Sequence, residues 1–199
     1  MDEIVEAALQ VGLDRLTMRR LAARLGVGAS TLYYHLESRD ELNILVGGYL
    51  LRKLRLQLAD PNAWEQAMRR GAHELRRVFE RVPGLARVLS DPRLSDTAMQ
   101  LNEDACSFLI RAGFAPAEAW LAVRAMADFV GAFVLRAQAW EAAGGSELDH
   151  VVAGSEAEAF PALHAARRAL GADSVEPRFD FALDCLLGGL RRVRSRPNS

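Results

Sequence analysis

The stretch from Leu16 to Leu42, LTMRRLAARLGVGASTLYYHLESRDEL, decides how the rest of the chain is organised. Thr17 precedes a run of strong helix formers, and its hydroxyl can accept a hydrogen bond from a free amide at the start of a helix. Gly26 follows that run, at the place where a helix commonly ends in a left-handed residue. A second short helix is expected from about Ala29 to Leu36. These signals predict two short helices joined by a tight turn.

A third helix is expected to begin directly after this pair, because Ser38 with Glu41 three residues later forms a capping box. Two short helices joined by a tight glycine turn form a helix-turn-helix. The outward side of the second helix is small and polar at its start and carries hydrogen-bonding aromatic side chains at its end. Such a face suits a helix that lies in the major groove of DNA. The alternative is an ordinary helical hairpin with a solvated polar face.

Arginines surround the predicted helix-turn-helix and can neutralise DNA phosphates, which is the sequence-independent part of DNA affinity. They are Arg15, Arg19, Arg20, Arg24 and Arg39. We therefore predict a DNA-binding head. Its expected DNA contacts are Thr17, Arg19, Ala29, Ser30, Thr31, Tyr33, Tyr34, His35 and Arg39.

Two short motifs in this stretch resemble the DNA-binding head of the tetracycline-repressor (TetR) family. They are the turn Leu25-Gly26-Val27 and the run Thr31-Leu32-Tyr33-Tyr34-His35. The resemblance covers about the first quarter of the chain and extends more weakly over the rest. It implies a helix-turn-helix DNA-binding domain at 1–45 and an all-helical effector-binding and dimerisation domain at 46–199. It also implies a homodimeric repressor that a small-molecule effector releases from a palindromic double-stranded DNA operator.

The composition allows one domain or two small ones, since the chain has 199 residues of which 50% are hydrophobic. The net charge of −1 means that any DNA affinity must come from local charge. Cys106 and Cys185 lie far apart in the sequence without metal-type spacing, so we expect two reduced thiols. No signal peptide or membrane-spanning run is evident, and we expect a cytoplasmic protein without a membrane partner.

Helical spacing of apolar residues continues along the chain, and no strand pattern or internal repeat is present, so an all-α fold is predicted. The expected helices run over about 2–11, 18–25, 29–36, 39–58, 62–81, 85–89, 95–112, 116–143, 158–170 and 178–193.

The helices at 116–143 and 178–193 are apolar on more than one face and must be buried, either by their own chain or by a second copy. In the TetR family the corresponding helices of two copies pair as a four-helix bundle. The expected dimer contacts are therefore Val130, Val134, Leu183, Leu186, Leu187 and Leu190. The alternative is a monomer with a large core.

Polar residues on otherwise apolar helices indicate a pocket in the body. Arg124 and Asp128 are four residues apart and share a helix face. The expected effector pocket comprises His73, Leu75, Phe79, Leu89, Asn102, Ala105, Cys106, Arg124, Asp128 and Phe129. The composition of this set suggests an apolar or aromatic effector with an anionic or polar group for Arg124 or Arg136.

One departure from the namesake of the family concerns its magnesium–tetracycline complex. By alignment on Gly113-Phe114, the two positions that hold that complex read Leu89 and Arg136 in this chain, and two further drug-contacting positions read Gly71 and Ala105. A hard cation needs oxygen ligands, which a leucine and an arginine do not supply. We expect no metal, no cofactor and no tetracycline binding.

Two other functions remain open. An all-α enzyme could use His73, Glu103, Asp128 and His164 for acid–base chemistry, but the sequence has no nucleophile–base spacing, metal cluster or phosphate loop. A regulator could instead act through a protein partner without a small ligand.

Overall fold

The computed structural model of the chain describes residues 2–13, 15–36, 38–54, 56–82, 84–85, 96–144, 151–170 and 175–195. Regular structure in these residues is helical, which confirms the all-α prediction. The helices are α1 (Asp2–Val11), α2 (Met18–Leu25), α3 (Ala29–His35), α4 (Arg39–Leu51), the 3-10 helix η1 (Pro61–Ala63), α5 (Trp64–Arg81), α7 (Asp96–Arg111), α8 (Pro116–Ala142), α10 (Pro161–Leu170) and α11 (Val175–Arg194). The helix predicted at 85–89 falls outside the described residues except for Leu85.

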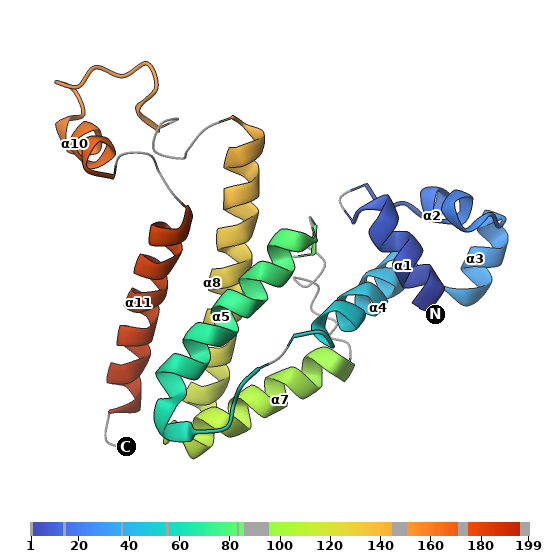
Figure 1. Ribbon diagram of the computed structural model, residues 1–199, viewed down its shortest axis with the longest axis horizontal. Coiled ribbons are helices and arrows are strands. Elements are labelled where there is room, and N and C mark those ends of the chain that lie inside the picture. The colour runs from blue at the N-terminus through green and yellow to red at the C-terminus, as the bar shows by residue number, and fades with distance from the viewer. Residues whose placement is uncertain are drawn as a thin grey trace.

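Helices α1, α2 and α3 form a small head at one side of the molecule, and α4 joins it to the body (Figure 1). The head packs around side chains that are fully or almost fully buried. They are Val5, Ala8, Leu16, Leu21, Leu32 and Leu36, with Leu42 and Val46 from α4. Because α4 contributes to this core, it is packed against the head rather than merely connected to it.

The local signals that bound the head helices are formed as the sequence predicts. The Thr17 hydroxyl accepts a hydrogen bond from the Arg20 amide at 3.2 Å, and the Ser38 hydroxyl accepts one from the Glu41 amide at 3.1 Å. Gly26 has a φ of 69°, in the left-handed region where glycine carries no steric cost. The ends of these helices are therefore set by short-range interactions.

The prediction that the fourth helix continues to residue 58 is wrong, because α4 ends at Leu51. Beyond it the described residues 52–54 and 56–60 form a non-helical linker before η1 begins. Leu54, Leu56 and Leu58 occupy alternate positions of this linker, and all three line a cavity in the body. Burial against the body outweighs the helical spacing of Leu54 and Leu58 that the sequence suggested.

Helix α8 is the centre of the body and contacts α5, α7 and α11 (Figure 1). The largest buried side chains of this part are Trp64, Phe108, Leu109, Phe179, Leu183 and Leu187. Trp64 meets Phe114 edge to face, with ring centroids 4.9 Å apart. Arg76 is a buried charged residue: its Nε donates to Glu80 at 2.6 Å, and its guanidinium lies 4.7 Å from the Phe179 ring centroid.

The residues expected to join two copies belong mostly to the core of the single chain. Val130, Val134, Leu183, Leu187 and Leu190 are buried within it, and only Leu186 is partly exposed. Their side chains are already covered where α11 packs on α8, so a contact between copies has to use the outward faces of these helices. None of the helices in the described ranges is long and apolar enough to cross a bilayer.

Candidate DNA-binding face and effector cavity

Helix α3 has one buried and one exposed side. Leu32 is 2% exposed and holds the helix to the head, whereas Tyr33 is 52% and Tyr34 is 87% exposed. The residues at the start of the helix, Ala29, Ser30 and Thr31, are also exposed. The side chain of His35 lies outside the described residues. The outward face of α3 therefore combines small polar residues with two phenols, which are side chains that can bond base edges and backbone oxygens.

The five arginines of the head all lie at its surface. Two of them are held by the head itself: Arg20 Nη1 donates to the Arg15 carbonyl at 3.1 Å, and Arg24 Nη2 donates to the side-chain oxygen of Gln10. Thr17 is exposed and engages its hydroxyl in the cap of α2. Arg19 and Arg39 are exposed at the first turns of α2 and α4, so the positive charge flanks α3 on both sides in sequence.

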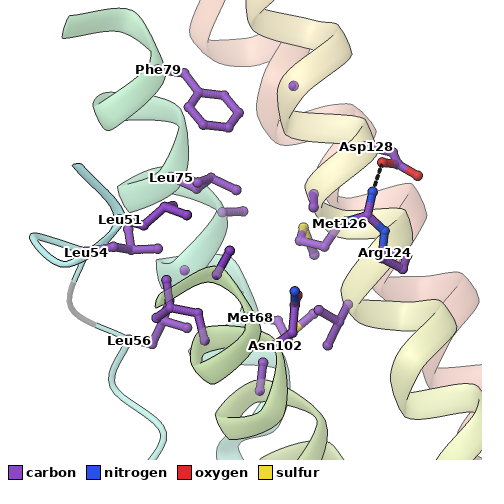
Figure 2. Close-up of a pocket in the computed structure, with 18 of the residues that line it drawn as sticks. Leu51, Leu54, Leu56, Met68, Leu75, Phe79, Asn102, Arg124, Met126 and Asp128 are labelled. Carbon is purple, nitrogen blue, oxygen red and sulfur yellow. Dashed lines mark hydrogen bonds and ion pairs between the residues drawn. The ribbon is translucent and has the colours of Figure 1, made fainter. Parts of the chain in front are cut away.

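The body contains a cavity of about 400 Å³ between the linker, α5, α7 and α8 (Figure 2). Its lining residues are Leu51, Leu54, Leu56, Leu58, Ala67, Met68, Gly71, Ala72, Leu75, Phe79, Ala98, Leu101, Asn102, Ala105, Val123, Arg124, Met126, Ala127, Asp128, Gly131, Ala132 and Leu135. Among these, only Asn102, Arg124 and Asp128 have polar side chains. The size and apolar lining are those of a small-molecule site.

The cavity brings together six of the ten residues predicted to line a pocket: Leu75, Phe79, Asn102, Ala105, Arg124 and Asp128. Cys106 is half-buried and is not among the lining residues, and burial raises the pKa of its thiol, with a smaller contribution from the charge of Glu103. Leu89 lies outside the described residues.

His73 and Phe129 face α11 rather than the cavity. The His73 Nε2 atom lies 3.1 Å from Oδ1 of Asp180, and its ring meets Phe179 edge to face. Phe129 stacks on Phe179, with ring centroids 5.1 Å apart. Both residues therefore belong to the packing of α11 on α5 and α8, on a different side of their helices from Leu75 and Asp128.

The linker leucines and the end of α4 are the cavity residues that sequence reasoning missed. Leu51, Leu54, Leu56 and Leu58 line it, together with Met68, Val123 and Met126 from the helices. The alternating run LRLQL at 54–58 was a usable signal, because a period of two is typical of an extended segment with one buried side.

The charged groups of the cavity are paired with each other. Arg124 Nη2 donates to Oδ1 of Asp128 at 2.8 Å, one helical turn away (Figure 2). The Arg124 side chain is 37% and the Asp128 side chain 68% exposed, so the pair lies at the rim of the cavity. Across the described residues, no group of three or more histidine, cysteine, aspartate or glutamate side chains could hold a metal ion.

Comparison with protein families decides the identity of this arrangement. Residues 1–44 match the model of bacterial regulatory proteins of the tetR family, and residues 58–194 match that of the tetracyclin repressor-like C-terminal domain. The chain belongs to the TetR family. Members of this family are DNA-binding transcriptional regulators, and the helix-turn-helix head with a helical body follows the same plan.

The relatives of this TetR-family chain match it over nearly its whole length. The tetracycline repressor protein class G of Vibrio anguillarum is 29% identical over 197 residues, covering 96% of this chain and 91% of the relative. Apo ActR from Streptomyces coelicolor has a TM-score of 0.84 at 29% identity, covering 97% of this chain and 95% of ActR. ActR in complex with actinorhodin also has a TM-score of 0.84, at 27% identity, with 98% of both chains covered.

Proposed function

We propose that this TetR-family protein is a homodimeric repressor that binds a palindromic operator and releases it when a small molecule occupies the body cavity. Residues 1–45 would bind DNA, and residues 46–199 would bind the effector and the second copy. The observation that carries the proposal is the outward face of α3, on which Tyr33 and Tyr34 are exposed while Leu32 anchors the helix. We infer regulation rather than catalysis, because the related proteins are regulators.

The head residues proposed to contact DNA divide by role. Ala29, Ser30 and Thr31 start α3 and would approach base edges in the major groove, with Tyr33, Tyr34 and His35 reaching bases and adjacent backbone. Thr17, Arg19 and Arg39 stand at helix starts, where side chains and free amides bind phosphate. Base contacts would supply sequence selectivity, and the arginines would supply affinity that falls with salt.

Dimerisation would use the outward surfaces of α8 and α11. Phe181 is 73% exposed on α11, and Leu121 is 64% exposed on α8. A β-carbon built at Gly188 or Gly189 meets no atom of the described residues within 4 Å, so the α11 surface is open there to a close partner. A twofold dimer would present two α3 helices about 34 Å apart, one turn of DNA, and would match a palindrome.

Effector binding would act on the head through the linker. The cavity wall includes Leu51, the last residue of α4, and the three linker leucines that follow it. A molecule in the cavity would therefore touch the segment that leads into the core of the head. For the effector to release DNA, it must bind more tightly to the arrangement of the protein that does not bind DNA than to the arrangement that does. The difference between these two binding free energies of the effector equals the change that it causes in the binding free energy of DNA. The complex of the related ActR with actinorhodin supports a small-molecule effector.

A gel-shift titration with palindromic fragments from the region upstream of the gene tests the proposal. We expect a sequence-selective shift that weakens steeply as salt rises, because arginine–phosphate contacts release counterions. Analytical ultracentrifugation of the same preparation should give a dimer. A chain that shifts all duplexes equally, or none, would remove DNA recognition from the account.

A further inference from the structure

The wall of the cavity gives little to a charged ligand. Apart from Asn102, Arg124 and Asp128, the lining side chains are aliphatic, methionine, phenylalanine or glycine. Placing a charge against such a surface is strongly unfavourable unless a partner of opposite charge is available there. Whether the cavity can bind a charged ligand therefore depends on whether Arg124 or Asp128 offers an uncompensated charge.

Arg124 and Asp128 compensate each other. Their side chains are joined at 2.8 Å along one face of α8 (Figure 2), and both residues are among those that line the cavity. A carboxylate approaching Arg124 would come close to the carboxylate of Asp128, and a cation approaching Asp128 would come close to the guanidinium. The like-charged member of the pair would repel either ligand and offset most of its attraction to the opposite charge, even where the pair itself stays intact.

Asn102 is the uncharged polar group of the cavity. Figure 2 shows it extending from α7 towards the space between α5 and α8. Its amide can both donate and accept, so it can pair with a hydroxyl or a carbonyl group of a neutral molecule. A half-buried amide that meets such a group gains a hydrogen bond without the cost of burying a charge.

We propose that the cavity selects an uncharged, largely apolar effector, which rests on the effector binding put forward above. The sequence suggested an apolar or aromatic effector with an anionic or polar group for Arg124 or Arg136, and the proposal keeps the polar alternative and drops the anionic one. Arg136 is exposed and is not among the residues that line the cavity, and Arg124 has its charge balanced by Asp128.

Two fluorescent probes with the same ring system test the charge preference. N-phenyl-1-naphthylamine is uncharged, and 8-anilino-1-naphthalenesulfonate carries an added sulfonate. Titration of the full chain should give a dissociation constant for the neutral probe no higher than that for the anionic one. In Asp128→Asn, which keeps the shape and removes the carboxylate, affinity for the anionic probe should rise about fivefold while that for the neutral probe stays within about twofold.

A cavity-filling variant shows where the probes bind. The β-carbon position of Gly131 lies 3.7 Å from Cε2 of Phe79, so a longer side chain at Gly131 must occupy cavity space. Gly131→Leu should weaken the neutral probe at least about tenfold, the effect of lost apolar contact area of roughly 60 Å² at about 25 cal/mol per Å². Circular dichroism checks that the variant folds, and Ala127→Leu on the same wall replaces it if it does not.

The outcomes separate this inference from the function on which it rests. Tighter binding of the anionic probe by the unaltered chain, lost in Arg124→Gln, would overturn the neutral-effector inference and leave the cavity as a ligand site. An unchanged ratio of the two probes in Asp128→Asn would also overturn it. Binding that survives the filling variants would remove the cavity as a ligand site altogether, while DNA recognition would still be judged by the gel shift.

Discussion

The Cδ2 atom of Leu56 lies 3.4 Å from the position that a β-carbon on Gly71 would occupy. A linker side chain is thus seated against α5 at a glycine, inside the cavity wall. Because the linker follows α4 directly, this contact joins the cavity to the helix that packs on the DNA-binding head. The structure therefore gives a short physical route between the two proposed sites.

Replacing Gly71 by alanine tests how firmly this contact is packed. An added methyl group at 3.4 Å from Leu56 is in ordinary van der Waals contact, so the side chain need not move far. Alanine within a helix is favoured over glycine by about 0.8–1 kcal/mol, and we expect Gly71→Ala to stabilise the fold by up to that amount. Urea unfolding followed by circular dichroism measures the change.

Gly131→Ala on α8 is the matched control, because its β-carbon would meet Phe79 at 3.7 Å on the same cavity. Both variants should gain stability. If Gly71→Ala lost stability while Gly131→Ala gained it, Leu56 would be held too rigidly to move away from the added methyl group. That result would contradict a linker that responds to the contents of the cavity.

Thr17→Ala should destabilise the head by about 1 kcal/mol, because the Arg20 amide loses the hydroxyl that caps α2. Thr17→Ser keeps an oxygen at this position and should retain most of the stability. Hydrogen exchange of the amides of α2 measures the effect locally, which matters if the head and body unfold separately. Equal protection in the alanine and serine variants would show that the cap contributes nothing.

Tyr33→Ala and Arg39→Ala should affect DNA binding differently. Tyr33 is half exposed on the face of α3 proposed to meet bases, and its loss should weaken operator binding about tenfold while non-specific binding changes little. Arg39 is exposed at the start of α4, and its loss should weaken both and reduce the salt slope by about one. Gel shifts with operator and scrambled duplexes at several salt concentrations measure both constants.

Equal losses of operator and non-specific binding in Tyr33→Ala would contradict a base-contacting role. Leu32 provides a check on interpretation: it is buried beneath the same helix, so its substitution should unfold the head rather than alter selectivity. Circular dichroism of each variant separates these two effects.

The head could be predicted from the sequence because its boundaries depend on near neighbours. The cap at Thr17 spans three residues, the left-handed turn needs only Gly26, and Ser38 bonds an amide three residues on. Helix geometry alone also predicts that Leu32 lies on a different side of α3 from the exposed tyrosines.

The body could be predicted less completely, because its side chains are sorted by contacts between distant segments. The spacing of Leu54 and Leu58 is helical, yet both line the cavity from a non-helical linker that lies against the helices of the body. His73 is a polar residue on an apolar helix, but Asp180 and Phe179, more than 100 positions later, turn it towards α11. The burial of Arg76 likewise depends on a contact with Phe179, and the residues next to Arg76 in the sequence do not predict it.

An ion pair between Glu65 and Arg191 joins the start of α5 to the end of α11. We expect this pair to make the stability of the fold depend on pH. Arg191 Nε donates to Glu65 Oε1 at 2.7 Å, and its Nη2 donates to Oε2. The hydrogen bond from Arg191 lowers the pKa of Glu65 below its usual 4.5, against a smaller opposing effect of burial. A carboxyl whose pKa is lowered by folding stabilises the folded chain above its unfolded pKa, and this stabilisation is lost as the pH falls through the folded pKa.

Arg191→Gln should therefore reduce the free energy of unfolding near pH 7, and its difference from the unaltered chain should shrink below pH 4.5 as Glu65 becomes protonated. Arg192→Gln is the matched control, since Arg192 is the exposed next residue of α11 and the substitution removes the same charge. Urea unfolding at a series of pH values measures both variants. A deficit of Arg191→Gln that stays constant down to pH 2, or that Arg192→Gln reproduces, would assign the effect to general charge rather than to the pair. Because Glu65 lies one residue beyond Trp64, which packs on Phe114, a confirmed pH dependence would also indicate that this pair anchors the end of α11 to the start of α5.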